Sequence, residues 1–440
     1  MRIVALALAF SFVAIAEDAN WPNWRGPQRD STQPAAKGLP STWSRTENVL
    51  WRTALPSWSA ASPAVWRDTV FVTSAQVGFS DTGSSGLIGH AIRGLLSKWN
   101  SEDDIVLLAI DAGNGSVRWE RTVGDGNRMW LKQNEASPSP VTDGTNVWAV
   151  TGGGVVSCFD FDGDLKWRRE LQTDYGEFGL NWGYASSPVL HEGDLYIEVL
   201  HGHTTDDPSY VLSLDAADGH TKWRIERPTD AISESHDAYT TPTLAEIDGT
   251  TYLVVTGAGY VTMHDLHSGK EVARVGGLIP DVNRNYRIVG SPSVVGDILI
   301  APSRQRPLLA FRMAPGPKLT RLWNFDRGAD VPTPASDENH VYVVTDRGIL
   351  TVLNLADGSP VGSPTRLEPG NYSSSPVIAD GKLYVVSEEG TTSVVRLDDA
   401  SSIASVNKID EYTLSTPAIG HDRIYMRSAK ALYCFRETAQ

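Results

Sequence analysis

The sequence predicts an all-β protein, an eight-bladed β-propeller of four-stranded repeats whose last blade is closed by the N-terminal strand. Three features repeat along the 440 residues: a Ser/Thr-Pro pair, a run of β-branched and aromatic residues, and a turn in which Asp and Gly precede Trp. Repeats of about 40 to 50 residues are typical of propeller blades, because one blade buries its apolar faces only against its neighbours. The alternatives are a seven-bladed ring and two packed half-rings.

The Ser/Thr-Pro pair marks the start of the innermost strand of each blade. Successive prolines lie 41 to 54 residues apart, except for a first step of 77 residues. Proline has no backbone N–H, and it is tolerated there because the inner edge of a blade is unpaired. The eight pairs are Ser62-Pro63, Ser139-Pro140, Ser187-Pro188, Thr241-Pro242, Ser291-Pro292, Thr333-Pro334, Ser375-Pro376 and Thr416-Pro417.

A second strand and a tight turn follow each pair. Residues 70–73 (Val-Phe-Val-Thr) are the first of the β-rich runs, and the next strand ends in Asp111, followed by Gly115 and Trp119. The Asp side chain closes such a turn and Gly accepts a positive φ. We expect the Trp to cover the edge of the neighbouring blade. The predicted seam tryptophans are Trp51, Trp119, Trp167, Trp223 and Trp323.

The ends of the chain predict how the ring closes. The last repeat stops after residues 432–436, its third strand, and residues 49–55 supply the missing fourth strand with Trp51 in the Trp position. The expected organisation is a secretory signal peptide, an N-terminal extension and a single propeller, with an insertion in blade one. Their ranges are 1–16, 17–47, 48–440 and 76–104.

The signal peptide is predicted from a basic Arg2, a short apolar stretch and the small-x-small sequence Ala14-Ile15-Ala16. We therefore expect a secreted protein, periplasmic in a cell with two membranes, with no transmembrane span after cleavage. The alternative is a retained N-terminal anchor. The insertion carries apolar residues at helical spacing, which predicts an amphipathic helix. This helix acts as a lid over the propeller face, or it docks a partner or a membrane surface.

Composition excludes several classes of protein. The formal net charge of −15 argues against nucleic acid and anionic membranes as main partners. Two cysteines exclude a disulfide scaffold, a zinc site of paired CxxC motifs and a haem attachment motif. Cys158 and Cys434 occupy equivalent strand positions in blades two and eight, so we expect small buried core residues and no bridge.

The turn-and-Trp pattern resembles the repeat of pyrroloquinoline quinone (PQQ) propellers. The segment Trp21-Pro22-Asn23-Trp24-Arg25-Gly26-Pro27 is similar to the opening of the PQQ-binding-like β-propeller repeat proteins, which are short secreted chains. The resemblance covers essentially the whole mature chain. It implies the eight-fold ring shared by quinoprotein dehydrogenases and the periplasmic outer-membrane-assembly propeller, and it implies no settled activity.

Functional groups of a propeller sit on the loops before the innermost strands and between the second and third strands. Aromatic residues, arginines and carboxylates around one funnel suit an anionic, planar or peptide ligand. The alternative is that these loops are merely polar and the aromatics plug the channel. The loops between second and third strands also place Asp346 and Arg347 near the funnel. The predicted ligand-binding residues are Trp58, Trp130, Asn134, Asn181, Trp182, His236, Tyr239, Asn283, Arg284, Tyr286, Arg287, Arg304, Arg327 and Asp330.

Two local motifs have competing interpretations. The two arginines of residues 283–287 (Asn-Arg-Asn-Tyr-Arg) either clamp a carboxylate or phosphate or pair with Asp330 or a Glu of a neighbouring blade. His201 and His203 precede Asp206 and Asp207 at a spacing that suits a plain turn better than a metal site. We therefore predict no metal site.

The resemblance implies that quinoprotein dehydrogenases use PQQ with a Ca²⁺ held by Glu and Asn, a catalytic Asp, and often a disulfide between adjacent cysteines. This chain has no adjacent cysteines, and none of its residues can be matched to that set, so no catalytic residue is assigned. The predicted function is a monomeric binding or scaffold module for another envelope protein or a small anionic ligand. The alternatives are a PQQ-dependent oxidoreductase and an envelope or outer-membrane protein assembly factor.

Overall fold

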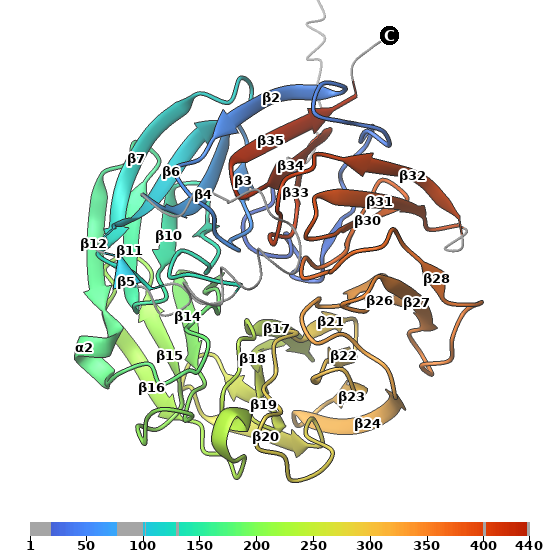
Figure 1. The fold of residues 1–440 in the computed structure, drawn as a ribbon. Helices are drawn as coiled ribbons and strands as arrows, with labels where there is room; N and C mark the ends of the chain where they lie inside the picture. Colours follow the sequence, from blue (N-terminus) through green and yellow to red (C-terminus); the bar gives the residue numbers. More distant parts are fainter. Residues whose placement is uncertain (1–18, 77–99, 102, 129–131, 399–401, 438–440) are drawn as a thin grey trace, which may run out of the picture.

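Eight four-stranded antiparallel sheets stand around a central axis, as Figure 1 shows. The structure is a computed structural model that describes residues 19–76, 100–101, 103–128, 132–398 and 402–437. The helical segments within these residues are α2 (Leu171–Tyr175) and the 3₁₀-helix η1 (Ser233–His236). The arrangement confirms the predicted eight-bladed all-β propeller.

Three predictions fall on residues that the structure does not describe. These are the signal peptide at 1–16, Trp130, and the amphipathic helix expected within 76–104. The end of that insertion is described as β5 (Asn100–Ser101), which pairs with β8 (Asn127–Arg128) in a small separate sheet.

Every innermost strand begins at the residue that follows a Ser/Thr-Pro pair, as the sequence predicts. The second and third strands of each blade are rich in β-branched and aromatic residues, which suit a pleated surface buried on both faces. The first four blades comprise β3 (Ala64–Trp66), β4 (Thr69–Ala75), β6 (Ile105–Asp111) and β7 (Val117–Gly124); β9 (Val141–Thr142), β10 (Asn146–Val150), β11 (Val155–Asp160) and β12 (Leu165–Glu170); β13 (Val189–His191), β14 (Asp194–Val199), β15 (Tyr210–Asp215) and β16 (Thr221–Glu226); and β17 (Thr243–Ile247), β18 (Thr250–Gly257), β19 (Tyr260–Asp265) and β20 (Glu271–Gly276).

The remaining blades repeat this pattern, and blade seven gains a fifth strand, β1 (Thr32–Gln33), which pairs in parallel with the innermost strand. Blades five to eight comprise β21 (Ser293–Val295), β22 (Ile298–Ala301), β23 (Leu308–Ala314) and β24 (Lys318–Phe325); β25 (Ala335–Ser336), β26 (His340–Val344), β27 (Ile349–Asn354) and β28 (Thr365–Arg366); β29 (Val377–Ala379), β30 (Lys382–Val386), β31 (Thr391–Arg396) and β32 (Ile403–Lys408); and β33 (Ala418–Gly420), β34 (Arg423–Arg427), β35 (Ala431–Arg436) and β2 (Val49–Ala54).

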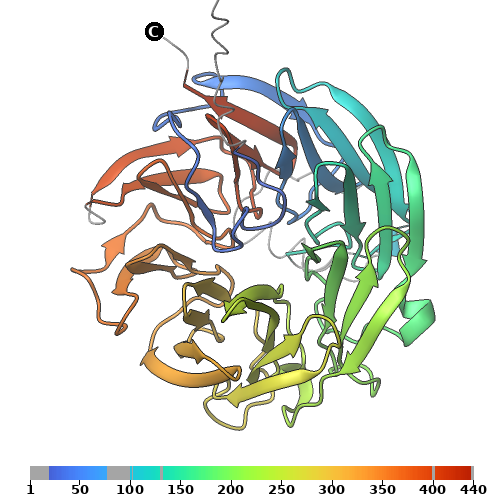
Figure 2. The same cartoon turned by 180° about the vertical axis from the view of Figure 1, so that it is seen from behind.

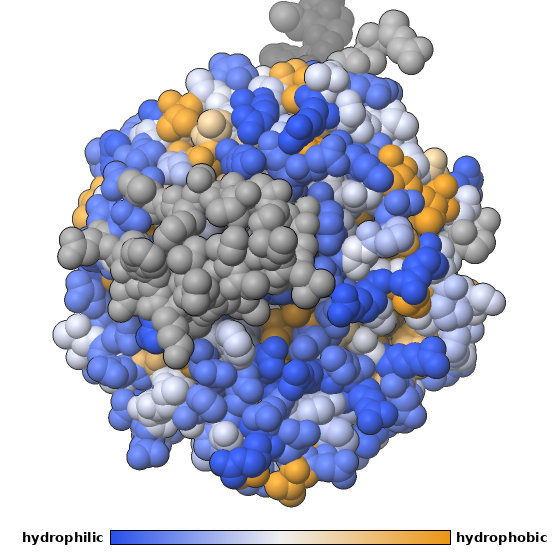
Figure 3. Space-filling model, in the orientation of Figure 1, coloured by the Kyte–Doolittle hydropathy of each residue, from blue (hydrophilic) through white to orange (hydrophobic). Residues whose placement is uncertain are grey.

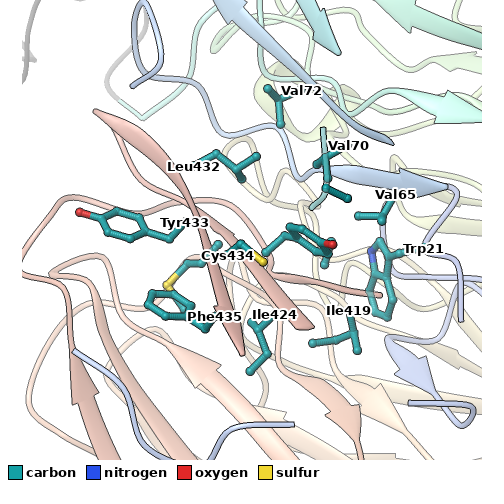
Figure 4. Close-up of a cluster of buried hydrophobic side chains, with 14 of the residues drawn as sticks. Trp21, Val65, Val70, Val72, Ile419, Ile424, Leu432, Tyr433, Cys434 and Phe435 are labelled. Carbon is teal, nitrogen blue, oxygen red and sulfur yellow. The ribbon is translucent and has the colours of Figure 1, made fainter. Parts of the chain in front are cut away.

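The N-terminal strand closes the ring. Strand β2 pairs antiparallel with β35, with Trp51 opposite Cys434, and so forms the outer strand of blade eight. Figure 4 shows the apolar cluster at this closure, in which Trp21 lies against Val65 of blade one and Ile419 of blade eight. Both cysteines are buried and unbridged, which confirms the prediction made for them.

The predicted seam tryptophans hold neighbouring blades together. The Trp119 indole N–H donates to the carbonyl of Phe161 in blade two at 2.8 Å, and Trp223 donates to Leu266 in blade four at 2.9 Å. The turn glycine of the receiving blade lies under the indole, and a Cβ on Gly163 would lie 2.9 Å from the Trp119 ring. Trp51, Trp167 and Trp323 make the equivalent bond.

A closed circle of eight hydrogen bonds surrounds the central axis. The backbone N–H of each motif Ser or Thr donates to the hydroxyl of the motif residue in the next blade, for example from Ser62 to Ser139 at 2.9 Å. The circle ends where Thr416 donates to Ser62 at 3.0 Å. The intervening bonds, between 2.8 and 3.1 Å, join Ser139, Ser187, Thr241, Ser291, Thr333, Ser375 and Thr416 in turn.

Candidate functional site

A cavity of about 540 Å³ occupies the centre of the ring. Seven of the eight motif hydroxyl residues line it, so the circle of hydrogen bonds forms its waist. Above the waist, the wall consists of loops that precede innermost strands or join second to third strands. Figure 3 views this loop face and shows a recess near the centre, with hydrophobic residues inside it and hydrophilic residues below it.

The N-terminal segment lies at the opposite end of the cavity, where Trp24 is one of the lining residues. Figure 2 shows this segment reaching the centre of the ring on the side away from the loops. The buried Arg25 guanidinium donates to the carbonyls of Pro292 at 2.8 Å and Pro334 at 3.0 Å, in blades five and six. Burial lowers the pKa of Arg25 to about 10, and the nearby Asp30 opposes that shift.

The same segment is attached to further blades. The backbone of Trp21 exchanges two hydrogen bonds with Val65 of blade one, and Arg29 donates to the carbonyl of Leu190 in blade three at 2.7 Å. The Gln33 side chain contacts the Ile419 carbonyl in blade eight. The segment that resembles the opening of the PQQ-like repeat proteins is therefore a structural floor for the cavity.

Two aromatic side chains of the cavity wall are fixed by polar contacts. The Trp182 indole N–H donates to Glu234 Oε1 at 2.7 Å, and the backbone N–H of Trp182 donates to the Tyr239 hydroxyl at 3.1 Å. The Arg287 guanidinium lies 5.9 Å from the centre of the Trp182 ring. These contacts present a rigid aromatic surface to the cavity.

Three cationic side chains line the cavity, and they differ in their partners. Lys132 is paired with the buried Glu388 at 2.6 Å. Arg287 lies 3.4 Å from Glu234, and it also reaches a carboxylate in blade six. Arg347 is exposed and donates to the Asn371 side-chain oxygen at 2.8 Å. Within the described chain Arg347 has no carboxylate partner, so its charge is available to a ligand.

Two carboxylates line the cavity, and both are engaged with the protein. Asp346 accepts the backbone N–H groups of Asp330 at 3.0 Å and Val331 at 3.1 Å, and burial raises its pKa. Asp330 Oδ2 lies 3.4 Å from Arg304 and 3.9 Å from Arg287. Ca²⁺ requires six to eight oxygen ligands. On these two carboxylates, Asp330 Oδ1 is the oxygen left without a hydrogen-bond partner among the described residues. One such oxygen beside arginines does not fit the calcium that quinoprotein dehydrogenases use, and it supports no catalytic step through that ion.

Four of the predicted ligand-binding residues meet on the cavity wall: Trp182, Tyr239, Arg287 and Asp330. Arg304 does not line the cavity, but its guanidinium contacts the Asp330 carboxylate. Arg287 pairs with Glu234 and Asp330 of the adjacent blades, as the blade-to-blade interpretation of the Asn283–Arg287 motif predicts.

The other predicted residues lie away from the cavity wall. Trp58 is buried in a small apolar cluster, and its carbonyl accepts the Asn134 side-chain N–H at 2.8 Å. The backbone N–H of Asn181 donates to the Asp237 carboxylate, and the Tyr286 hydroxyl donates to the backbone carbonyl of Arg304. His236 ends η1, and the exposed residues are Asn283, Arg284 and Arg327.

Sequence reasoning did not single out several wall residues. Trp24 appeared only as part of a family-like segment, because nothing local shows that this segment crosses the ring. Asp346 and Arg347 were placed on the correct loops without a specific role. Asn371, on the loop before β29, is one of the loop residues that the sequence pattern does indicate. Lys132 is not, and its partner Glu388 lies on a distant loop.

The histidine motif and one surface cluster show no built metal site. His201 Nδ1 accepts the N–H of Gly179 at 3.0 Å and so serves the loop. Among the described residues, Asp215, Asp218 and His220 are the group of acidic and histidine side chains close enough together to hold an ion. They lie at a turn on the outer part of blade three, and Asp215 and Asp218 accept backbone N–H groups of that turn.

Sequence comparison decides the family. The model of the family described as outer membrane protein assembly factor BamB matches residues 102–363, more than half of the chain. The chain belongs to this BamB-like family of PQQ-like propellers. No curated protein matches it.

Solved structures agree with the fold of the BamB-like family. The chain is similar to BamB from Moraxella catarrhalis, with a TM-score of 0.59 and 14% identity over 88% of this chain and all of the other. It is also similar to the quinohemoprotein alcohol dehydrogenase from Comamonas testosteroni, with a TM-score of 0.64 and 11% identity over 97% of this chain and 83% of the other. These likenesses concern the fold. No helix in the described segments has the length and hydropathy of a membrane span.

Proposed function

We propose that this propeller is a binding module whose central cavity takes a small planar anion. The observation that carries the proposal is Arg347, which lines the central cavity and has no carboxylate partner in the described chain. Arginine recognises carboxylate and phosphate groups through paired N–H donors. Trp24 and Trp182 line the same cavity and supply aromatic surface for a planar ligand.

The cavity has the volume and lining of a small-molecule site. About 540 Å³ lies within the usual range for such pockets. The motif hydroxyls at the waist add polar groups, and Lys132 adds a second, partly neutralised cation. A ligand with one strong anionic group near Arg347 and further polar groups toward the waist matches this distribution.

Calorimetry with a panel of aromatic carboxylates tests the proposal. The panel is benzoate, isophthalate, trimesate and metal-free PQQ, each titrated into the wild type and into Arg347→Gln. We expect at least one compound to bind with a Kd below about 1 mM and Arg347→Gln to weaken it about tenfold, equal to about 1.4 kcal/mol. The control is Arg312→Gln, an exposed arginine on β23 paired with Asp297. Absence of binding across the panel, or equal loss in both variants, contradicts the proposal.

PQQ titrations with and without Ca²⁺, and oxidation assays with a redox dye, distinguish this binding role from that of a quinoprotein dehydrogenase. Because the cavity carboxylates are engaged, we expect Ca²⁺ to leave PQQ affinity unchanged and PQQ-loaded protein to oxidise no alcohol or sugar with a dye acceptor. Calcium-dependent tightening together with dye reduction establishes the oxidoreductase instead.

Membership of the BamB-like family favours a second role, as a scaffold that engages another protein of the cell envelope. Under this proposal the chain is secreted, and it is periplasmic in a cell with two membranes. In-cell cross-linking of a tagged copy, followed by mass spectrometry, tests it. Enrichment of an outer-membrane assembly component over a tagged unrelated propeller supports the role, and enrichment of none contradicts it.

A further inference from the structure

Three exposed arginines lie on adjoining loops of blades five and six, outside the central cavity. They are Arg284, Arg306 and Arg327, and together they form what we call the arginine surface. None of the three side chains has a hydrogen bond or ion-pair partner within the described chain. Most other exposed arginines of the described chain have a hydrogen-bond or ion-pair partner. Arg312, for example, pairs with Asp297, and Arg436 pairs with Asp422.

Contacts between the loops hold the arginine surface together. The Tyr286 hydroxyl donates to the backbone carbonyl of Arg304 at 2.6 Å and also contacts the carbonyl of Arg306. The backbone N–H of Gln305 donates to the carbonyl of Ala329 at 3.3 Å, which joins this loop to the one that carries Arg327. The three guanidinium groups are therefore carried by one connected platform rather than by separate loops.

Local charge on this platform is positive although the chain as a whole is acidic. The exposed carboxylates of the same loops are Asp281 and Asp326. Asp330 is already shared between Arg287 and Arg304, so it does not neutralise the arginine surface. In Figure 3 the face over β22 and β26 carries hydrophilic residues with hydrophobic ones between them. Arginine is enriched at protein interfaces, and the same platform carries the apolar Val282, which is 91% exposed.

We propose that the arginine surface docks an acidic, extended polypeptide segment of a partner protein. At physiological ionic strength the Debye length is about 8 Å, so the net charge of the whole chain is screened while contacts with individual arginines persist. A flexible chain can place single carboxylates on each guanidinium and an apolar side chain on Val282.

The surroundings favour a polypeptide over a flat anionic bilayer or a nucleic acid. The same face of the ring exposes Glu177, Asp206 and Asp207 on the loops of blade three. A uniformly anionic surface laid across the face meets these carboxylates as well as the arginines, and is repelled by them. A short segment confined to blades five and six avoids them.

Fluorescence anisotropy with labelled ten-residue peptides tests this proposal in 150 mM salt. The probes are an alternating Glu-Gly peptide and a matched Lys-Gly peptide. We expect the wild type to prefer the acidic peptide, and the triple variant R284Q/R306Q/R327Q to bind it about tenfold more weakly, equal to about 1.4 kcal/mol.

A matched triple variant controls for net charge. R312Q/R396Q/R436Q removes the same number of positive charges from exposed positions on third strands, and we expect less than a twofold change. Equal binding of the two peptides, or equal loss in both triples, overturns the proposal. Tighter binding to vesicles containing 30% phosphatidylglycerol, or to a single-stranded oligonucleotide, also overturns it. Arg347 is unchanged in both triples, so the cavity test remains separate.

Discussion

The backbone N–H of Thr416 donates a hydrogen bond to the hydroxyl of Ser62, 3.0 Å away, although 354 positions separate them in sequence. This bond completes the circle that joins all eight blades at the waist of the cavity. The motif thus has two functions: its proline starts the innermost strand, and its hydroxyl accepts the N–H of the preceding blade.

Removing one hydroxyl from this circle should destabilise the whole ring. Ser62→Ala leaves the buried N–H of Thr416 without its acceptor, which costs about 1 to 3 kcal/mol of the free energy of unfolding. Ser62→Thr is the control, because Thr occupies the equivalent position in three other blades. Urea denaturation measures both, and an unchanged midpoint for Ser62→Ala would argue against a structural role for the circle.

The seam between blades eight and one should not accept a side chain at Gly115. This residue has a φ of +77°, and a Cβ would lie 2.7 Å from the Trp51 ring. Gly381 has a similar φ of +69° with open space around it, so Gly381→Ala measures the backbone strain alone. We expect Gly115→Ala to lower the free energy of unfolding by about 2 kcal/mol more than Gly381→Ala. Equal losses in thermal or urea unfolding would show that the Trp51 contact adds nothing.

Stability should depend on pH through Glu198. Burial raises its pKa to about 8, while the Thr240 hydroxyl and the Arg227 charge oppose the shift. The folded state therefore keeps a proton that the unfolded chain releases above about pH 4.5, so the Glu198 contribution is lost as pH rises from about 5 to about 8.

Glu198→Gln isolates this contribution, because it keeps a neutral side chain of similar shape at every pH. We expect the stability difference between the wild type and Glu198→Gln to move in favour of the variant by up to about 1.4 kcal/mol per pH unit over that range. Exposed Glu246→Gln is the control. A pH-independent difference in urea unfolding would contradict the assignment.

The floor of the cavity should depend on Arg25. Arg25→Met removes the donors to the carbonyls of Pro292 and Pro334, which leaves two buried acceptors unpaired and costs about 2 to 4 kcal/mol. Limited proteolysis should then cut within residues 19–33 faster than in the wild type. Lys37→Met, an exposed change just beyond this segment, should leave the cleavage rate unaltered. Equal rates in both variants would mean that other contacts hold the floor.

The fold was predictable from the sequence because each blade repeats the same local signals. The turn from Asp111 to Gly115 and the Trp that follows it are short-range patterns, and their repetition fixes the ring and its closing strand. No local pattern identifies the Ser62 hydroxyl as a hydrogen-bond acceptor, because its donor, the backbone N–H of Thr416, belongs to the far end of the chain.

The site was predictable only in part, for the same physical reason. Trp182 and Arg287 stand on loops that lead into innermost strands, where a propeller must place side chains near its axis. Trp24 reaches the cavity because a long segment crosses the ring, and no local pattern encodes that path. The availability of Arg347 depends on which carboxylates its neighbours engage, which only the three-dimensional contacts decide.

The central claim is that the central cavity binds a small planar anion through Arg347. A crystal structure with the tightest-binding aromatic carboxylate of the panel tests it most directly. We predict planar electron density inside the cavity, with a carboxylate within about 3 Å of the Arg347 guanidinium and the ring against Trp24 or Trp182. Density for the compound elsewhere on the protein, with only solvent in the cavity, would contradict the claim.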